Sequence, residues 1–361
     1  MAVAMITTNA RAEEGDADGG VKSAIASFLL RTEIEGWVAA SYFYNFNDPD
    51  EQEDGNNAIG NPYHPDHNTF QFDEAVLVVD NAANKESPAG FHFEIFYGAT
   101  ARAEEDGSDF WIPSANVAYR LPFGPTITAG KFKTTIGYEV PGAPLNVNIT
   151  RGIVYTEFQP VDHTGVMLSN EYDSGLSWAF AAVNGDYSDP HDVNDGKGFL
   201  WGLGFGTDMF ASSFNGIVVS PPDGNRYVLD VVLEANPTDQ LLLWVNADYL
   251  NIETGGDNPW SVGVAVGGHY AIADNIGFGV RGEWGRGEDD GTTENPLSRL
   301  DGDVDVYSVT LTGDWSLTKN LTWKAEFQWQ GARGTNEDIF PKENYMTENQ
   351  YLLGTQIYYA F

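Results

Sequence analysis

Two histidines three residues apart are the first side chains whose spacing could serve chemistry. His64 and His67 form the motif HPDH within an acidic stretch. Imidazole nitrogens bind transition metals, but no further spaced ligands complete a site in the sequence. The chain contains no cysteine, which excludes thiolate metal sites, disulfide scaffolds and c-type haem attachment. We therefore expect no transition-metal centre.

Acidic residues are abundant enough to raise the question of a site for hard cations. The run DPDEQEDG, which begins at Asp48, has the acid content of a calcium loop, but Glu53 occupies the position where an EF-hand requires glycine. Asp301, Asp303 and Asp305 alternate in a second acidic stretch. We predict no cofactor, with Ca²⁺ or Mg²⁺ bound only loosely in the acidic loops.

Enzyme chemistry lacks a comparable signature. The sequence contains no G-x-S-x-G nucleophile motif, no Walker A motif and no Rossmann fingerprint. A barrel enzyme would need a Ser or Asp constellation with a histidine, and His163 and His269 are available, but no motif singles out a nucleophile. We predict that the chain is not an enzyme.

The remaining candidates for functional residues are charged side chains in segments where apolar and polar residues alternate. Their contribution would be electrostatic. Only 18 residues are basic against 53 acidic, yet Lys131, Lys133, Arg281 and Lys324 lie inside segments with apolar alternation. Charges on the polar side of a membrane-spanning strand would set the field and width of a water-filled passage. The predicted pore-lining residues are Glu94, Lys131, Lys133, Glu139, Arg151, His163, Asp230, Glu234, Asp248, Arg281, Glu283, Lys324 and Glu326.

Segments with a period of two must position these charges. In LTWKAEFQWQ, residues 321–330, apolar side chains occupy one face and polar side chains the other. The segments WSVGVAVGGHY, IGFGVRGEW and YVLDVVLEAN repeat this pattern, with Trp or Tyr near their ends as in the aromatic belts of membrane barrels. Segments of about ten residues suit tilted strands that cross a membrane.

Connections of alternating length join these segments. Short turns are predicted at 122–125, 173–175, 236–239, 273–275 and 318–320. Longer stretches rich in Asp, Glu, Gly and Asn occupy 47–68, 102–111, 187–197, 251–259, 286–303 and 331–348, and the turn near Met209 is not obvious. The sequence therefore predicts an all-β fold, a closed antiparallel transmembrane β-barrel of about 16 strands with short periplasmic turns and long external loops.

Both ends of the sequence carry targeting features. An apolar stub followed by Ala10 and Ala12 has the A-x-A pattern of a signal-peptide cleavage site. The expected organisation is a residual signal peptide at 1–12, an N-terminal periplasmic segment at 13–31 and the barrel at 32–361. The last residues, NQYLLGTQIYYAF, alternate up to Tyr359 and Phe361. This ending resembles the signal by which the barrel-assembly machinery recognises bacterial outer-membrane proteins.

One stretch resembles a known family. Residues 129–168, AGKFKTTIGYEVPGAPLNVNITRGIVYTEFQPVDHTGVML, are similar to the signature region of the OmpL-like outer-membrane β-barrel porins, which reads G-K-F-x-T-x-I-G-Y-E, then S/T-R after an Asn-containing loop, then P-x-x-H-T-G-V. The matching residues are Gly130, Lys131, Phe132, Thr134, Ile136, Gly137, Tyr138, Glu139, Asn148, Thr150, Arg151, Pro160, His163, Thr164, Gly165 and Val166. The resemblance departs at KAEFQWQ, which lacks the expected Arg and Asp. It implies a pore.

The long connection at 140–159 lies inside this resembling region. Its position suggests a constriction loop that folds into the barrel. Glu139 and Arg151 would then face each other or the wall. His163 lies on the polar face at the start of the next strand. We expect it to anchor the loop by a hydrogen bond, and this role is favoured over that of a titrating gate.

Two interpretations of the wall charges stay open at this point. Arg281 with Glu283, and Lys324 with Glu326, either form ladders along the wall or take part in selectivity. The net charge of −35 excludes a general nucleic-acid binder, which needs a basic face. The same charge either suits a salty habitat or attracts cations.

The leading hypothesis is an outer-membrane porin for passive diffusion of small hydrophilic solutes or ions, with a mild cation preference. The main alternative is a non-conducting barrel that acts as a receptor, an adhesin or a scaffold for a partner protein. A soluble β-sandwich lectin is a further alternative. The expected partners are outer-membrane lipid, the barrel-assembly machinery, small solutes or ions and, by analogy with other 16-stranded porins, two further copies in a homotrimer.

Overall fold

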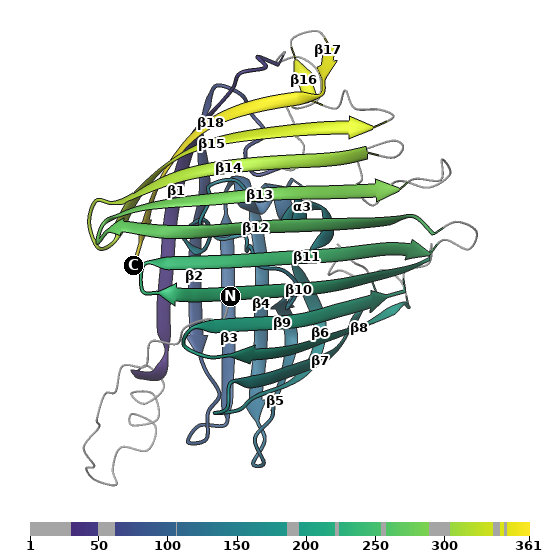
Figure 1. Ribbon diagram of the computed structural model, residues 1–361. Coiled ribbons are helices and arrows are strands. Elements are labelled where there is room, and N and C mark those ends of the chain that lie inside the picture. The colour runs from purple at the N-terminus through teal and green to yellow at the C-terminus, as the bar shows by residue number, and fades with distance from the viewer. Residues whose placement is uncertain are drawn as a thin grey trace.

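The computed structural model of the protein describes residues 30–49, 62–105, 107–185, 195–220, 224–253, 258–288, 304–334, 340–342 and 345–361 (Figure 1). The expected signal peptide at 1–12 lies outside these residues, as do Asp301, Asp303 and all but the last two residues of the expected segment 13–31. No helix among the described residues is long and apolar enough to cross a membrane.

Sixteen antiparallel strands form a closed barrel in the order β1-β18-β15-β14-β13-β12-β11-β10-β9-β8-β7-β6-β5-β4-β3-β2. These strands are β1 (Glu33–Asn45), β2 (Thr69–Asn81), β3 (Ala89–Tyr97), β4 (Phe110–Arg120), β5 (Thr126–Lys133), β6 (Asp162–Glu171), β7 (Leu176–Asn184), β8 (Lys197–Gly206), β9 (Phe210–Val219), β10 (Asn225–Thr238), β11 (Leu241–Glu253), β12 (Trp260–Ala273), β13 (Ile276–Glu288), β14 (Val304–Ser316), β15 (Leu321–Gly334) and β18 (Asn349–Ala360). The predicted fold class and strand number are confirmed.

The barrel closes between its first and last strands. Trp37 of β1 pairs with Ala360 of β18. Beyond that pair, Gly36 and Phe361 exchange two backbone hydrogen bonds of 3.1 and 2.9 Å. In the described barrel sheet every strand therefore has a neighbour on both sides, which is what a sheet in hydrocarbon requires.

Alternation along the strands separates an apolar outer surface from a polar interior. In β15, Trp323 and Phe327 are 37% and 39% exposed on the outside. Lys324, Glu326 and Gln328 point inward and are buried. The period-two pattern of the sequence thus places the polar side chains inside the barrel.

Short turns gather at one end of the barrel, as predicted, although one of them is displaced. The predicted turn at 236–239 is wrong by three residues, because Asn236, Pro237 and Thr238 extend β10 and Thr238 pairs with Leu241. The register shifts between Ala235 and Thr238. Proline has no amide hydrogen to donate to a ladder, so it is tolerated at such an irregularity. The turn near residue 209 lies between β8 and β9.

Five smaller elements of the described chain lie outside the barrel sheet. The hairpin of β16 (Phe340–Lys342) and β17 (Tyr345–Thr347) stands apart from the barrel sheet. Helix α2 (Ala99–Glu104) connects β3 to β4. The short 3-10 helix η1 (Ala143–Leu145) and helix α3 (Ile153–Phe158) both lie between β5 and β6.

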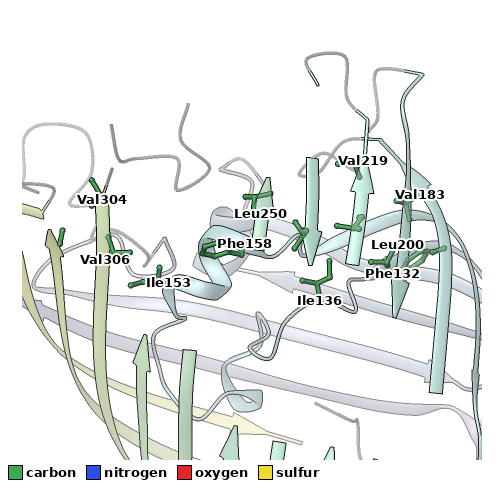
Figure 2. Close-up of a cluster of buried hydrophobic side chains, with 14 residues drawn as sticks. Phe132, Ile136, Ile153, Phe158, Val183, Leu200, Val219, Leu250, Val304 and Val306 are labelled. Atoms are coloured by element: carbon green, nitrogen blue, oxygen red, sulfur yellow. The ribbon is translucent and has the colours of Figure 1, made fainter. Parts of the chain in front are cut away.

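Residues 134–161, here called the inner segment, run inside the barrel between β5 and β6, and Figure 1 shows α3 behind the front wall of strands. Its Ile136, Ile153 and Phe158 are 3%, 3% and 0% exposed. Figure 2 shows these side chains among inward residues of several strands, including Leu200 and Val306. Burying each such side chain contributes about 1.5–3 kcal/mol to stability, so apolar packing helps to hold the inner segment against the wall.

Candidate functional site

Arg281 of β13 joins the barrel wall to the inner segment. Its guanidinium is fully buried and donates from Nη1 to Glu139 Oε1 at 2.6 Å and from Nε to Glu283 Oε2 at 3.1 Å. Nη1 also donates to the backbone oxygen of Thr150 at 2.7 Å. A buried guanidinium is tolerated only when paired and hydrogen-bonded, and here Glu283 and Thr310 belong to the wall whereas Glu139 and Thr150 belong to the inner segment.

Glu326 of β15 accepts four hydrogen bonds. The backbone amides of Ile149 and Thr150 donate to its carboxylate at 2.6 and 2.9 Å. The hydroxyls of Thr150 and Thr312 each donate at 2.6 Å. Bonds to an ionised acceptor are the stronger kind, so Glu326 fixes the middle of the inner segment to the wall.

Further wall charges bind backbone groups of the inner segment. Lys324 Nζ donates to the Asn146 oxygen at 2.7 Å, and the Val154 amide donates to Glu283 Oε1 at 3.2 Å. At Gly152, an ideal Cβ would lie 2.1 Å from Glu283 Oε1. Only glycine therefore permits this close approach between the inner segment and β13.

Glu74 of β2 holds the inner segment from another part of the wall, and the sequence analysis missed it. Its fully buried carboxylate accepts hydrogen bonds from Trp37 Nε1 at 2.5 Å, Thr100 Oγ1 at 2.6 Å and the Ala143 amide at 2.7 Å. The contact joins η1 to β1, β2 and α2. The inner segment is thus bonded to β2 as well as to β13 and β15.

Asn246 of β11, also missed, binds both ends of the inner segment. Its Oδ1 accepts from the Tyr138 amide and from Gln159 Nε2, each at 3.0 Å. The Tyr138 ring stacks on Trp244 with centroids 4.3 Å apart. A neutral amide gives no charge signal in the sequence, and these partners are too far apart along the chain for a local pattern to reveal them.

Arg151 is buried but binds its own segment. It donates to the backbone oxygens of Val140 at 2.8 Å and Ile149 at 2.7 Å, and to that of Pro141. Its guanidinium carbon lies 5.3 Å from the centre of the Tyr63 ring. Arg151 therefore holds the inner segment in its folded shape, whereas Glu139 contacts the wall through Arg281.

Lys131 and Lys133 lie at the end of β5, where the chain turns into the barrel. Lys131 Nζ is 3.2 Å from Asp162, and Lys133 Nζ is 2.7 Å from Glu94. His163, 3% exposed, lies with Nε2 3.1 Å from the hydroxyl oxygen of Thr134, the first residue of the inner segment.

The thirteen predicted pore-lining residues thus surround the inner segment or belong to it. Ten of them are buried, and Lys131, Lys133 and Glu234 are half-buried. Asp230 and Asp248 lie on the inward faces of β10 and β11, beside Asn246. At the closing strand, Tyr359 and Phe361 are 48% and 59% exposed.

A hydrogen-bonded cluster outside the strands joins three connections. Tyr63 and Tyr155 both donate to Glu104 Oε1, the second at 2.9 Å, and the two phenol oxygens are 2.9 Å apart. Burial raises the pKa of Glu104 to about 7. Glu104 of α2 therefore changes charge near neutral pH while holding the connection before β2 and α3 of the inner segment.

The sequence matches a family model, and the barrel is similar in fold to several solved structures. The family model described as "Putative beta-barrel porin-2, OmpL-like" matches residues 31–361. The fold is similar to the outer membrane channel DcaP of Acinetobacter baumannii, with a TM-score of 0.63, 13% identity and coverage of 91% of this chain and 97% of that one. OprB of Pseudomonas putida has a TM-score of 0.61 and 11% identity, with coverage of 95% of this chain and 97% of that one. OmpT of Vibrio cholerae has a TM-score of 0.60 and 13% identity, with coverage of 91% of this chain and 97% of that one.

At such low identities these structures share the fold alone. No curated protein matches the sequence. The family match covers nearly the whole chain, and the family is one of β-barrel porins. The protein therefore belongs to the OmpL-like beta-barrel porin-2 family and is a porin of the bacterial outer membrane.

Proposed function

We propose that this porin lets small hydrophilic solutes or ions diffuse passively and that the inner segment is its constriction. The observation that carries the proposal is the anchoring of one connection to inward side chains of β2, β11, β13 and β15. A segment fixed at several points of the wall sets a constant width, as a size-selective passage needs.

We propose a mild cation preference for the same passage. The chain carries a net charge of −35, and Asp230, Glu234 and Asp248 lie on the inward faces of β10 and β11. An acidic lining lowers the free energy of cations relative to anions inside a narrow passage. Lys131 and Lys133 moderate the effect.

Conductance in planar lipid bilayers, with the reversal potential in a salt gradient, tests this function. We expect open channels with a reversal potential of the cation-selective sign. In Glu326→Gln, hydrogen bonds to an ionised acceptor worth about 1.5–3 kcal/mol each are weakened, so excursions to larger conductance should become more frequent. Glu253→Gln removes the same charge at an exposed strand end and should behave as the unaltered protein. A purified, heat-modifiable barrel without channels would refute the proposal.

A non-conducting barrel is the second candidate, and the burial of ten of the thirteen predicted pore-lining residues favours it. If the inner segment plugs the lumen, the unaltered barrel is silent in bilayers, and deletion of residues 140–159 opens it. The function would then be that of a receptor, an adhesin or a scaffold for a partner protein.

We also propose that the protein forms a homotrimer inserted by the barrel-assembly machinery. A trimer form is known for OmpT of Vibrio cholerae, which shares the fold. The exposed apolar side chains of the outer surface would then contact either lipid or a neighbouring copy. The mass of the purified complex, measured by light scattering with the detergent subtracted, tests the trimer, and a monomeric mass would refute it.

A further inference from the structure

Two aspartates lie directly opposite each other on neighbouring strands. Asp230 of β10 pairs with Asp248 of β11 in the antiparallel register. Both side chains point inward, and the residues are 0% and 2% exposed. Like charges at directly opposite positions repel and destabilise a pair of strands, so either a bound cation or a shared proton must relieve this repulsion.

Amide groups satisfy only part of the pair. Asn246 Nδ2 donates to Asp230 Oδ1 at 2.7 Å and to Asp248 Oδ1 at 3.1 Å, and Asn215 Nδ2 donates to Asp230 Oδ2 at 2.6 Å. The fourth carboxylate oxygen, Asp248 Oδ2, is buried and accepts no hydrogen bond. Within the described residues, neither carboxylate forms an ion pair with Lys, Arg or His. The amides that contact the pair bring no positive charge to it.

A further polar oxygen lies on the next strand. Ser261, fully buried on the inward face of β12, pairs with Leu250, two residues from Asp248, and has an Oγ with no hydrogen-bond partner. Beside Asp248, β12 carries Gly263, whose ideal Cβ would lie 2.6 Å from the ring of Phe158. The aspartate pair is therefore enclosed between the wall and α3 of the inner segment.

We propose that Asp230 and Asp248 form a binding site for a divalent cation, with Ca²⁺ as the best-matched ion. Two carboxylates carry the two negative charges that such an ion neutralises, and hard cations take oxygen ligands from carboxylates, neutral oxygens and water. Asp248 Oδ2 is a free ligand in this position. Ca²⁺ bound there would join β10 and β11 beneath α3.

One further acid lies on the same inward face as the aspartate pair. Glu234 lies four residues beyond Asp230 on the same inward face of β10 and is half-buried. The site rests on the proposed function only for the route by which ions arrive. Binding itself can be measured on the refolded chain in detergent, without a conductance assay.

Terbium luminescence sensitised by tryptophan, with Ca²⁺ as competitor, is the appropriate measurement. Trp244 is buried on the inward face of β11, two residues before Asn246. We expect a saturable, Ca²⁺-displaceable signal from the refolded protein. In Asp248→Asn its affinity should fall by about tenfold or more. The control Asp274→Asn removes a charge from an exposed turn and should keep the saturable signal. Ions bound loosely to the acidic loops contribute equally to the unaltered protein, Asp248→Asn and Asp274→Asn, so they do not account for a difference in affinity.

Two further variants keep the test decisive. Trp244→Phe should lower the emission without changing the Ca²⁺ affinity, which locates the ion near β11. Ser261→Ala serves if Asp248→Asn fails to refold, as judged by heat-modifiable migration, and should also weaken binding. Equal affinity in the unaltered protein and the site variants would overturn the proposal, as would the absence of any saturable signal, which would mean that the pair is neutralised by a shared proton.

Bilayer recordings on the same preparations separate the two proposals. Open channels without the saturable signal would refute the cation site and leave the diffusion pore intact. A silent barrel that binds Ca²⁺ through Asp248 would refute the pore and leave the cation site intact.

Discussion

Arg281 is the cation that compensates the buried carboxylates of Glu139 and Glu283. Arg281→Gln leaves both charges uncompensated, so we expect the free energy of unfolding to fall by about 3–5 kcal/mol. Arg286 on the same strand pairs with Asp305 at 3.4 Å where both side chains are more exposed, and such a pair is worth about 0–1 kcal/mol. Denaturant unfolding in detergent, followed by tryptophan fluorescence, should separate Arg281→Gln from the control Arg286→Gln. Equal midpoint shifts would contradict the assignment.

Glu104 makes the stability of its cluster with Tyr63 and Tyr155 depend on pH. Because burial raises the pKa of Glu104 to about 7, the folded state binds its proton more tightly than the unfolded chain does. The stabilisation is complete below the ordinary pKa of glutamate and is lost as the pH rises through about 7. The melting temperature should therefore fall more between pH 5.5 and pH 8 in the unaltered protein than in Glu104→Gln. Glu86→Gln, in an exposed turn, should keep the full dependence, and identical slopes in all three proteins would disprove the effect.

Glu74 illustrates how much of the site a residue pattern can reveal. Ala39 pairs with Glu74 but Ala40 pairs with Phe72, so Asp73 is an extra residue in β2. This bulge lets both acids be buried, at 3% and 0% exposure, although strict alternation would place one of them against lipid. Two successive acids in a strand are the only local signal. The charges of β13 and β15 could be predicted because those strands alternate regularly.

At the scale of elements, the fit between the inner segment and β13 depends on Gly152. In Gly152→Ala the new methyl group would overlap Glu283 Oε1, and overpacking of this kind costs about 1–3 kcal/mol. The inner segment should move from the wall, so we expect noisier channel currents and a lower melting temperature. Gly206→Ala adds a methyl group with no heavy atom within 4 Å and is the matched control. Unchanged currents and stability in Gly152→Ala would show that the inner segment can adjust.

The positions of strands could be predicted from the sequence where local alternation determines them. They could be predicted less well where contacts with distant parts of the chain determine the structure. Period-two alternation determines each strand because one face meets lipid and the other the interior. The end of β10 departs from the prediction because tertiary pairing continues through Pro237 to Thr238. The path of residues 134–161 depends on distant partners such as Asn246, which is 87 residues from Gln159, and Glu326, which is 177 residues from Ile149.

For the whole molecule, the anchoring pattern relates the inner segment to barrel closure. Glu74 and Trp37 belong to the first two strands, whereas Glu326 belongs to β15. The first two strands and β15 come together in one closed barrel only after β18, which pairs with β15, also pairs with β1. Pairing of chain ends is slow because loop-closure entropy opposes contacts between distant residues. We therefore infer that the inner segment acquires its full set of contacts only when the barrel has closed.

Phe361 takes part in closing the barrel through its backbone, and its ring belongs to the expected C-terminal assembly signal. Phe361→Ala keeps the two backbone hydrogen bonds to Gly36 and removes only the exposed ring, so refolding into detergent should be close to that of the unaltered protein. If the ring is part of the assembly signal, the same variant should accumulate unfolded in cells. Tyr351→Ala removes a comparably exposed ring near the opposite end of β18 and controls for the loss of an aromatic. Heat-modifiable migration of membrane fractions gives the folded share, and equal losses in both variants would limit the role of Phe361 to packing.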